Sequence, residues 1–349
     1  MIVEPAPDSK VEDMNNLQTR ILKISLAFLA IASLAIAQPN TPDPARINDT
    51  LTICSFNIQF LGSSKKRDNA AISDILKSYD IVMIDELVAP PVNGQYPDGR
   101  TYIADPESKA FFDAMAPNGF SYAMSPEETG PGKKKHPGGT AAEWWVAFYK
   151  PATCEIAPDL PTGFISKKLC KNLDYQRVPF AFGFRTPDSS MDFVLIPVHL
   201  QPGKGTKNKD RRKHELGSIA AWIDSHDSIE KDFFILGDMN VYSAAELEYV
   251  TPAGFESLND ECRPTTTNVT GPDGGKPYDQ VMYRPSSTSY LVDSVFDLQV
   301  INLVDVMKSK WKYTSKRYPG KPYKHNAFRA YFSDHDPVVY RLIAGHKRG

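Results

Sequence analysis

The sequence predicts an α/β protein built on a mixed sheet, or on a pair of sheets, that is covered by helices. Short apolar or aromatic runs such as Phe233–Leu236 have the length and composition of buried strands. Amphipathic helical patterns lie between these runs, without a strict strand–helix alternation. The 349 residues are 41% hydrophobic and 23% charged, which is enough apolar material for a sizeable core. We predict one catalytic domain over residues 50–345.

The N-terminal segment has the pattern of an export signal. A basic flank precedes an apolar run that ends in a small-x-small cleavage pattern at Ala37. We predict a signal peptide at 1–37, with Met14 as the more conventional start, and a Pro-rich linker at 38–49. The protein is then secreted or periplasmic and has no stable membrane association once the signal is removed. An uncleaved signal anchor is the alternative.

Strands and helices follow one another along the rest of the chain. Aromatic and β-branched runs predict strands at 51–57, 80–86, 143–149, 178–185, 192–199, 233–238, 279–283 and 337–340. Apolar residues at helical spacing predict helices at 68–78, at 107–115 and through Glu215, Ile219 and Ile223.

Most of these strands end or begin at a polar residue. Such residues are Asn57, Glu86, His199, Asp238, Asn240, Glu143, Asp279, Asp334 and His335. Gly, Asp and Asn are also common turn residues, so a single such ending carries little weight. Repeated over several strands, the pattern indicates one sheet edge lined with groups that bind cations or move protons. Asp238 and Asn240, two residues apart, should project from the same side of their strand.

Six short motifs stand in the order found in the endonuclease/exonuclease/phosphatase superfamily. They are Ser55-Phe-Asn57, Asp85-Glu86, Val198-His-Leu200, Gly237-Asp-Met-Asn240, Tyr278-Asp279 and Ser333-Asp-His335. The chain most resembles secreted deoxyribonuclease I-like nucleases, over roughly Leu51 to Leu342. The resemblance implies a four-layer αββα sandwich of two packed mixed sheets. It also implies a metal-dependent phosphodiesterase, an endodeoxyribonuclease, that acts on DNA, with RNA as an alternative substrate.

The candidate ligands for a metal ion are carboxylate and amide oxygens. Glu86 is the first choice, with Asn57 beside it and Asp334 as a further ligand. Without a Cys/His cluster of zinc spacing, this set favours Mg²⁺, with Mn²⁺ or Ca²⁺ as alternatives.

His199 and His335 are the candidate acid–base pair, because an unperturbed imidazole titrates near neutral pH. By resemblance Glu143 orients His199, and we assign Asp279 to His335. Which histidine is the acid stays open. Asp238 and Asn240 should hold phosphate oxygens or orient the attacking water.

Other positions bear on substrate binding. Arg177 in Arg177-Val-Pro179 resembles an arginine of the deoxyribonuclease branch that contacts substrate phosphate. The arginine and tyrosine with which that branch probes the minor groove would fall on Val88 and Ala141. The chain therefore lacks those groove contacts.

Basic residues gather in three segments although the chain is nearly neutral. Beyond residue 37 there are 38 acidic and 37 basic residues, but Lys133, Lys134 and Lys135 are consecutive, and 204–214 and 308–324 are also strongly basic. Basic loops near the site suit a polyanion such as DNA. Solvated loops kept charged for solubility are the alternative.

Two other functions compete with a nuclease. A sphingomyelinase-type lipid phosphodiesterase, or another phosphoesterase of the superfamily, would use the same core but would want exposed apolar loops. A binding protein that lost catalysis should lack a catalytic residue, and none is missing. We also expect a monomer, a buried free Cys54 and, among the alternatives that export allows, a Cys154–Cys170 disulfide.

Overall fold

The structure, a computed structural model, describes residues 50–64, 66–132, 136, 142–268, 274–311 and 318–344. The predicted signal peptide at 1–37, the linker at 38–49 and the start at Met14 lie outside these residues and stay predictions. So does the substrate-binding role of Lys133, Lys134 and Lys135. Within the described residues, no helix is both long enough and apolar enough to cross a membrane.

Six strands form the first sheet, in the order β14–β15–β1–β2–β6–β5. Only β1 and β2 run parallel, and the other neighbours are antiparallel. The bounds are β1 (Thr50–Leu61), β2 (Ile81–Leu87), β5 (Ser121–Met124), β6 (Trp144–Tyr149), β14 (Gln299–Val300) and β15 (Val338–Ile343).

The second sheet follows the order β12–β13–β11–β10–β9–β7, with β8 paired to β9. β10 and β11 are its parallel pair. The bounds are β7 (Glu155–Ile156), β8 (Gly163–Phe164), β9 (Phe180–Arg185), β10 (Asp192–His199), β11 (Phe233–Asp238), β12 (Glu256–Ser257) and β13 (Asp279–Tyr283). A separate hairpin pairs β3 (Gly94–Gln95) with β4 (Thr101–Tyr102).

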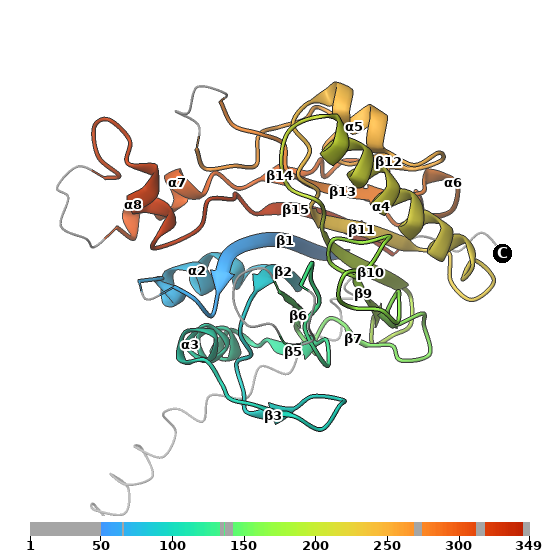
Figure 1. The fold of residues 1–349 in the computed structure, drawn as a ribbon, viewed down its shortest axis with the longest axis horizontal. Coiled ribbons are helices and arrows are strands. Elements are labelled where there is room, and N and C mark those ends of the chain that lie inside the picture. Colours follow the sequence, from blue (N-terminus) through green and yellow to red (C-terminus); the bar gives the residue numbers. More distant parts are fainter. Residues whose placement is uncertain are drawn as a thin grey trace, which may run out of the picture. The chain divides into compact units, whose positions relative to one another are not determined.

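The two sheets pack face to face between helical layers (Figure 1). Their shared core includes Trp145, Phe193 and Phe234, each fully buried. Burying one such side chain stabilises the fold by roughly 1.5–3 kcal/mol. A second core lies between the first sheet and its helices, and a third lies between the second sheet and its helices. The predicted four-layer sandwich is confirmed.

The helices of the first sheet are α2 (Asn69–Leu76), α3 (Pro106–Met115), α7 (Leu303–Val306) and α8 (His325–Arg329). Those of the second sheet are α4 (Thr206–Asp224) and α5 (Ala244–Val250), and α6 (Pro285–Thr288) follows β13. Two short 3₁₀ turns, η1 (Ala116–Asn118) and η2 (Met307–Ser309), extend α3 and α7. Asp68 and Asp105 accept hydrogen bonds from the first-turn N–H groups of α2 and α3, which explains where these helices begin.

The expected Cys154–Cys170 disulfide is wrong. Cys154 is a buried thiol in the turn that follows β6. Cys170 pairs by a backbone bridge with Gly130, next to the Thr129–Glu143 bridge that precedes β6. The two cysteines therefore lie toward opposite ends of β6, a strand about 20 Å long at the usual rise per residue. Cys54, as expected, is a buried thiol in β1.

The basic segment 204–214 is not a loop, because α4 begins at Thr206. Part of its charge is structural. Arg212 is fully buried and donates to the carbonyls of Gln201 and Gly203, and it forms an ion pair with Glu246. Only the first residues of the segment precede the helix.

Candidate active site

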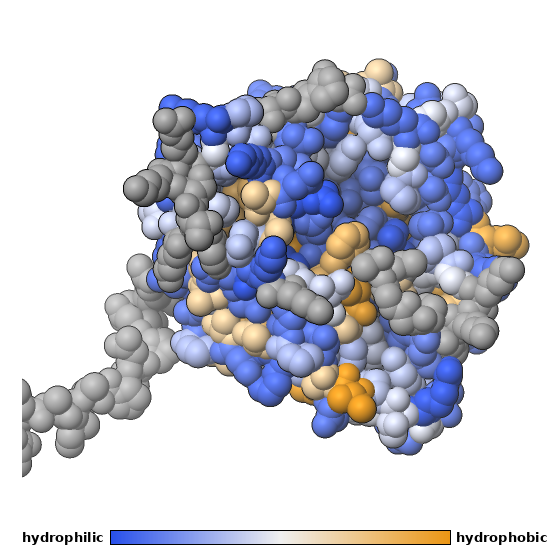
Figure 2. All heavy atoms as spheres, turned by 60° about the vertical axis from the view of Figure 1, so that its left-hand side comes forward, coloured by the Kyte–Doolittle hydropathy of each residue, from blue (hydrophilic) through white to orange (hydrophobic). Residues whose placement is uncertain are grey.

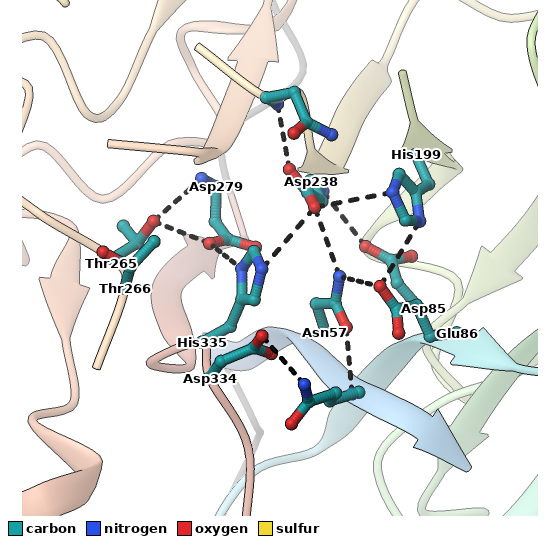
Figure 3. Close-up of polar contacts among 12 residues, drawn as sticks. Asn57, Asp85, Glu86, His199, Asp238, Thr265, Thr266, Asp279, Asp334 and His335 are labelled. Atoms are coloured by element: carbon teal, nitrogen blue, oxygen red, sulfur yellow. Dashed lines mark hydrogen bonds and ion pairs between the residues drawn. The ribbon is translucent and has the colours of Figure 1, made fainter. Parts of the chain in front are cut away.

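Side chains from both sheets meet where the parallel strands end (Figure 3). A parallel pair places its carboxyl ends together, and the antiparallel neighbours begin at the same edge. Eight polar side chains meet at this edge. Asn57, Glu86, His199 and Asp238 come from the carboxyl-terminal parts of β1, β2, β10 and β11. Glu143, Asp279, Asp334 and His335 lie at or just before the beginnings of β6, β13 and β15. These are the residues that the strand-end pattern singled out, and all except Asp334 are buried.

Asp238 lies between the two histidines. Its Oδ2 is 3.6 Å from Nε2 of His199 and 3.6 Å from Nε2 of His335. The same oxygen accepts a hydrogen bond from Asn57 Nδ2 at 3.2 Å, and Oδ1 accepts one from the Asn240 backbone at 2.9 Å. Burial raises the pKa of the Asp238 carboxyl, although both imidazoles oppose the shift. One carboxylate and two imidazoles thus converge on a single point.

His335 is held from behind by Asp279. The Asp279 carboxylate is 2.8 Å from His335 Nδ1, and the Thr265 hydroxyl donates to the same carboxylate at 2.6 Å. Burial lowers the pKa of His335, but Asp279 and Asp238 outweigh it and raise that pKa well above the usual value. The contact at Nδ1 leaves Nε2 to face Asp238 and a ligand.

His199 has the corresponding support from Glu143. The two oxygens of Glu143 are 3.0 and 3.2 Å from His199 Nδ1. Burial and Arg177 lower the pKa of His199, whereas Glu143 and Asp238 raise it, and the net result is about 9. The assignment of each carboxylate to its histidine, made on sequence, therefore corresponds to a direct contact.

Arg177 contacts Glu143 and the backbone of His199, and its phosphate-binding role stays a prediction. Its Nε is 2.5 Å from Glu143 Oε1, and its Nη1 donates to the His199 carbonyl at 3.4 Å. The side chain is buried. In this position Arg177 neutralises Glu143 behind His199.

Irregular backbone directs Asn57 and Glu86 into the site. The register of β1 against β2 shifts between Asn57 and Leu61, and that of β2 against β6 shifts between Ile84 and Leu87. Such bulges re-aim side chains next to active sites. Glu86 has φ +66°, a left-handed conformation that costs a non-glycine residue of order 1–3 kcal/mol. The rest of the fold holds Glu86 in this strained conformation, which directs its carboxylate into the site.

The expectation that Asp238 and Asn240 project from the same side of one strand is wrong, because the strand ends before Asn240. β11 ends at Asp238, and Asn240 has φ +51°. Its side-chain amide donates to the Leu200 carbonyl at 3.2 Å. Asn240 therefore joins the site through its backbone bond to Asp238, rather than as a second side chain on the same face of a strand.

Asp85 is a site residue to which the sequence assigned no role. It is buried, and its Oδ2 accepts a hydrogen bond from the Asp238 backbone at 3.1 Å. Burial is the main cause that raises the pKa of this carboxyl. The signal was present, since Asp85 forms a carboxylate pair with Glu86 at the end of an apolar strand.

The family assignment follows from the whole chain. The sequence profile of the endonuclease/exonuclease/phosphatase family matches residues 54–335. The chain belongs to this family. Its members are phosphoesterases, so the convergent carboxylates and imidazoles belong to a phosphate-ester hydrolase. The resemblance drawn from six short motifs is confirmed.

Solved structures of this family share the fold at low sequence identity. Truncated Caenorhabditis elegans TDP2 aligns with a TM-score of 0.50 and 12% identity, over 84% of this chain and 97% of that one. A Bacteroides thetaiotaomicron endonuclease/exonuclease/phosphatase family protein gives 0.50 and 15%, over 84% and 97%. The mannosyl-6-phosphatase Bt3783 of the same organism gives 0.51 and 15%, over 84% and 99%. A comparison with curated protein sequences finds no match.

A hard divalent cation, the cofactor type general in this family, fits the oxygens around Glu86. Glu86 Oε1 accepts from Asn57 Nδ2 at 3.0 Å, and Asp334 Oδ2 accepts from Gln59 Nε2 at 2.9 Å and from Arg329 Nη1 at 3.2 Å. Burial raises the pKa of Glu86, and the nearby Glu143 and Asp334 charges add to the shift, against His199. This surplus of buried negative charge favours a cation.

Among the described residues, no three His, Cys, Asp or Glu side chains are arranged to hold a metal ion alone. Few protein ligands are typical of Mg²⁺, which keeps water and substrate phosphate in its coordination shell. The carboxylate oxygens of Glu86 and Asp334 suit that behaviour, whereas Asn57 presents its Nδ2 to Glu86 and its Oδ1 accepts from the Gln59 backbone. The ion itself stays a prediction.

Proposed function

We propose that the chain is a secreted, divalent-metal-dependent nuclease that hydrolyses phosphodiester bonds of DNA, with RNA as a further substrate. The observation that carries the proposal is the pair of imidazoles on either side of Asp238. Each presents Nε2 toward Asp238 Oδ2 at 3.6 Å, and each has a carboxylate at Nδ1. Hydrolysis of a diester needs one group to take a proton from water and another to give a proton to the leaving oxygen.

The site residues divide this chemistry among themselves. One of His199 and His335 takes the proton of the attacking water, and the other protonates the departing alkoxide. Asp238 orients the water or a phosphoryl oxygen between them, while Glu143 and Asp279 fix which imidazole nitrogen faces the substrate. Glu86, Asn57 and Asp334 would hold the cation. A bound divalent cation neutralises charge on the phosphoryl oxygens and polarises the phosphorus centre.

The preference for nucleic acid over lipid rests on the surface. The face in Figure 2 is mainly hydrophilic, and its apolar residues form small separate patches. The most exposed large apolar side chains of the described residues, Val295, Ile103 and Leu173, come from different loops. Membrane insertion needs a larger continuous apolar surface. The alternative of a sphingomyelinase-type or other phosphoesterase remains an outcome of the test.

The test compares substrates under the same conditions. Purified protein is incubated with plasmid DNA, RNA, sphingomyelin and a sugar phosphate, with and without Mg²⁺. The proposal expects metal-dependent cleavage of DNA, and His199→Ala and His335→Ala each reduce its rate by about 10²-fold or more. His226→Ala is a matched control, because His226 lies beyond the end of α4, outside the site, and its ring contacts Trp222 and Ser225. Turnover of the lipid or the sugar phosphate without cleavage of DNA would replace the proposal.

Export is tested separately. The mature protein recovered from the medium or the periplasm should begin at Gln38. A full-length, membrane-bound form would contradict cleavage after Ala37.

A further inference from the structure

Arg67, which lies just before α2, is a buried cation with no assigned role in the site. Its side chain is 2% exposed, and its Nε donates to Glu107 Oε1, in the first turn of α3, at 2.7 Å. A buried charge is costly unless it is paired and its hydrogen bonds are satisfied. The remaining bonds of this guanidinium are made to the backbone around the candidate cation ligands.

The Arg67 guanidinium joins two segments that are far apart in the sequence. Nη1 donates to the carbonyl of Ile58 and, at 2.6 Å, to that of Phe332, and Nη2 donates to the carbonyl of Gln59. Ile58 and Gln59 belong to the end of β1, where its register against β2 shifts. Phe332 lies two residues before Asp334. Arginine suits this place because its planar fork reaches several acceptors in fixed directions.

The end of β1 that Arg67 holds contacts the candidate cation ligands directly. The Phe60 N–H donates to Glu86 Oε2 at 2.9 Å, and Gln59 Nε2 donates to Asp334 Oδ2 at 2.9 Å. Gln59 and Phe60 have φ +60° and +55°, left-handed conformations that residues other than glycine keep only where the surroundings impose them. The bonds from the guanidinium to the carbonyls of this stretch help to impose them.

Glu107 holds the guanidinium from the other side. Its Oε2 accepts a hydrogen bond from the backbone of Gly62, so it ties both Arg67 and the chain that follows β1 to α3. Burial lowers the pKa of Arg67, whereas Glu107 and the two candidate cation ligands oppose that shift. The positive charge of Arg67 repels a cation, so this residue favours cation binding only through the geometry that it imposes.

We propose that Arg67 is a positioning residue for the cation site, which fixes the relative positions of Glu86 and Asp334 and thereby sets the affinity for the divalent ion. The inference rests on the metal-dependent mechanism of the proposed function and deepens it. Arg67 acts through the backbone of two segments, one that contacts Glu86 and one that carries Asp334. Partners that orient the ligands of a metal typically contribute roughly 10–100-fold to its affinity.

The experiment changes the geometry and keeps the charge. Arg67→Lys retains a cation but loses the planar fork, and Glu107→Asp retains a carboxylate on a side chain that is shorter by one methylene. The binding of Mn²⁺ in the absence of substrate is measured by isothermal titration calorimetry. Each variant should raise the Kd about tenfold or more. The Mg²⁺ concentration for half-maximal DNA cleavage should rise by a similar factor, and higher Mg²⁺ should restore much of the lost rate.

Arg212→Lys is the matched control, because it also removes a buried guanidinium. Arg212 is fully buried, forms an ion pair with Glu246 and donates to two backbone carbonyls, which belong to Gln201 and Gly203. Its replacement should lower the thermal unfolding temperature, as Arg67→Lys does, without changing the Kd for Mn²⁺. Glu86→Gln identifies the site, since it should abolish this binding. Thermal unfolding checks that each variant folds, and Glu107→Asp decides the question if Arg67→Lys does not.

The outcomes distinguish the two proposals. If Mn²⁺ binds to the wild type and to Glu86→Gln with the same Kd, the cation site is wrong and the inference falls with it. If Glu86→Gln abolishes binding but folded Arg67→Lys or Glu107→Asp binds as tightly as the wild type, or Arg212→Lys weakens binding equally, the positioning role is wrong. Normal Mn²⁺ binding without cleavage of DNA would overturn the nuclease function and leave the positioning role of Arg67 standing.

Discussion

Replacing Glu143 with Gln tests whether this carboxylate sets the protonation of His199. Glu143 is completely buried, and its Oε1 lies 3.0 Å from His199 Nδ1 and 2.5 Å from Arg177 Nε. Gln has nearly the same shape and keeps an oxygen acceptor, so the substitution mainly removes the charge. His199 then keeps Asp238 and Glu86 as anionic neighbours.

The size of the effect follows from the neighbours of the ring. Burial and Arg177 lower the pKa of His199, yet Glu143 and Asp238 bring it from 6.5 to about 9. Since one pKa unit corresponds to about 1.4 kcal/mol, the two anions together favour the protonated ring by at least about 3 kcal/mol. Glu143→Gln removes one of these anions and should therefore lower the pKa of His199. It also leaves Arg177 buried without its anion, which should reduce the free energy of unfolding by about 3 kcal/mol.

The assay is the pH dependence of kcat/KM for bis(p-nitrophenyl) phosphate, from about pH 5 to 10. The limb that reports His199 should lie at lower pH in Glu143→Gln than in the wild type. If His199 is the base, the variant reaches its plateau at lower pH, and if it is the acid, activity is lost at lower pH. Whether activity is gained or lost at lower pH in the variant therefore also shows whether His199 is the base or the acid. Unfolding curves at each pH exclude denaturation, and a limb that does not move would refute the idea that Glu143 controls His199.

Three further predictions concern other parts of the molecule. Excess EDTA should abolish activity reversibly, and Glu86→Gln should resemble the chelated enzyme at ordinary metal concentrations; full activity in EDTA rules out the metal mechanism. Gly237→Ala should lose about 3 kcal/mol or more in urea unfolding, since φ is +130° and a Cβ would lie 2.3 Å from the Val198 carbonyl oxygen. Gly217→Ala, a helix position with open space, is its control and should be neutral or stabilising, so equal losses would contradict the steric argument. Burial raises the pKa of Glu230 from 4.5 to about 7, so the stability linked to its protonation is fully present below pH 4.5 and is lost as the pH rises through 7. Glu230→Gln should therefore gain up to about 3 kcal/mol at pH 8 and little at pH 4; a gain that is independent of pH would show that ionisation is not the cause.

The sequence predicts this site well because its residues stand at the ends of strongly patterned strands. The strands 192–199, 233–238 and 279–283 have the expected bounds, and each contributes His199, Asp238 or Asp279 at its edge. The end of a strand in a packed sandwich is fixed relative to its neighbouring strands. A polar residue at that end is therefore held at a defined place on the edge of the sheet. The contacts of Glu143 with His199 and of Asp279 with His335 follow from the same regularity.

The sequence does not predict which buried side chains form ion pairs or which cysteines lie close together. Arg177 turns toward Glu143 because a fully buried carboxylate needs a cation nearby. The sequence does not show that the side chains of Glu143 and Arg177 are buried. The same holds for Arg212, whose charge contributed to a basic segment but is used to hold Glu246 and two carbonyls. The cysteine pairing failed because spacing along the chain does not reveal that a whole strand separates Cys154 from Cys170.

The site lies across the boundary between the two sheets, and this determines which residues must be kept there. Asn57 and Asp85 come from the first sheet, and both bond to Asp238 of the second, at 3.2 and 3.1 Å. The second bond is made to the Asp238 backbone, next to Gly237, where a Cβ would lie 2.7 Å from Asp85 Oδ2. A side chain at position 237 would therefore separate the sheets at the point where their functional groups meet. Because the first sheet supplies Glu86 and His335 while the second supplies His199 and Asp238, neither sheet alone holds the candidate acid–base pair with its candidate cation ligand. The close approach at Gly237 thus brings the candidate catalytic groups of the two sheets together as well as allowing the sheets to pack.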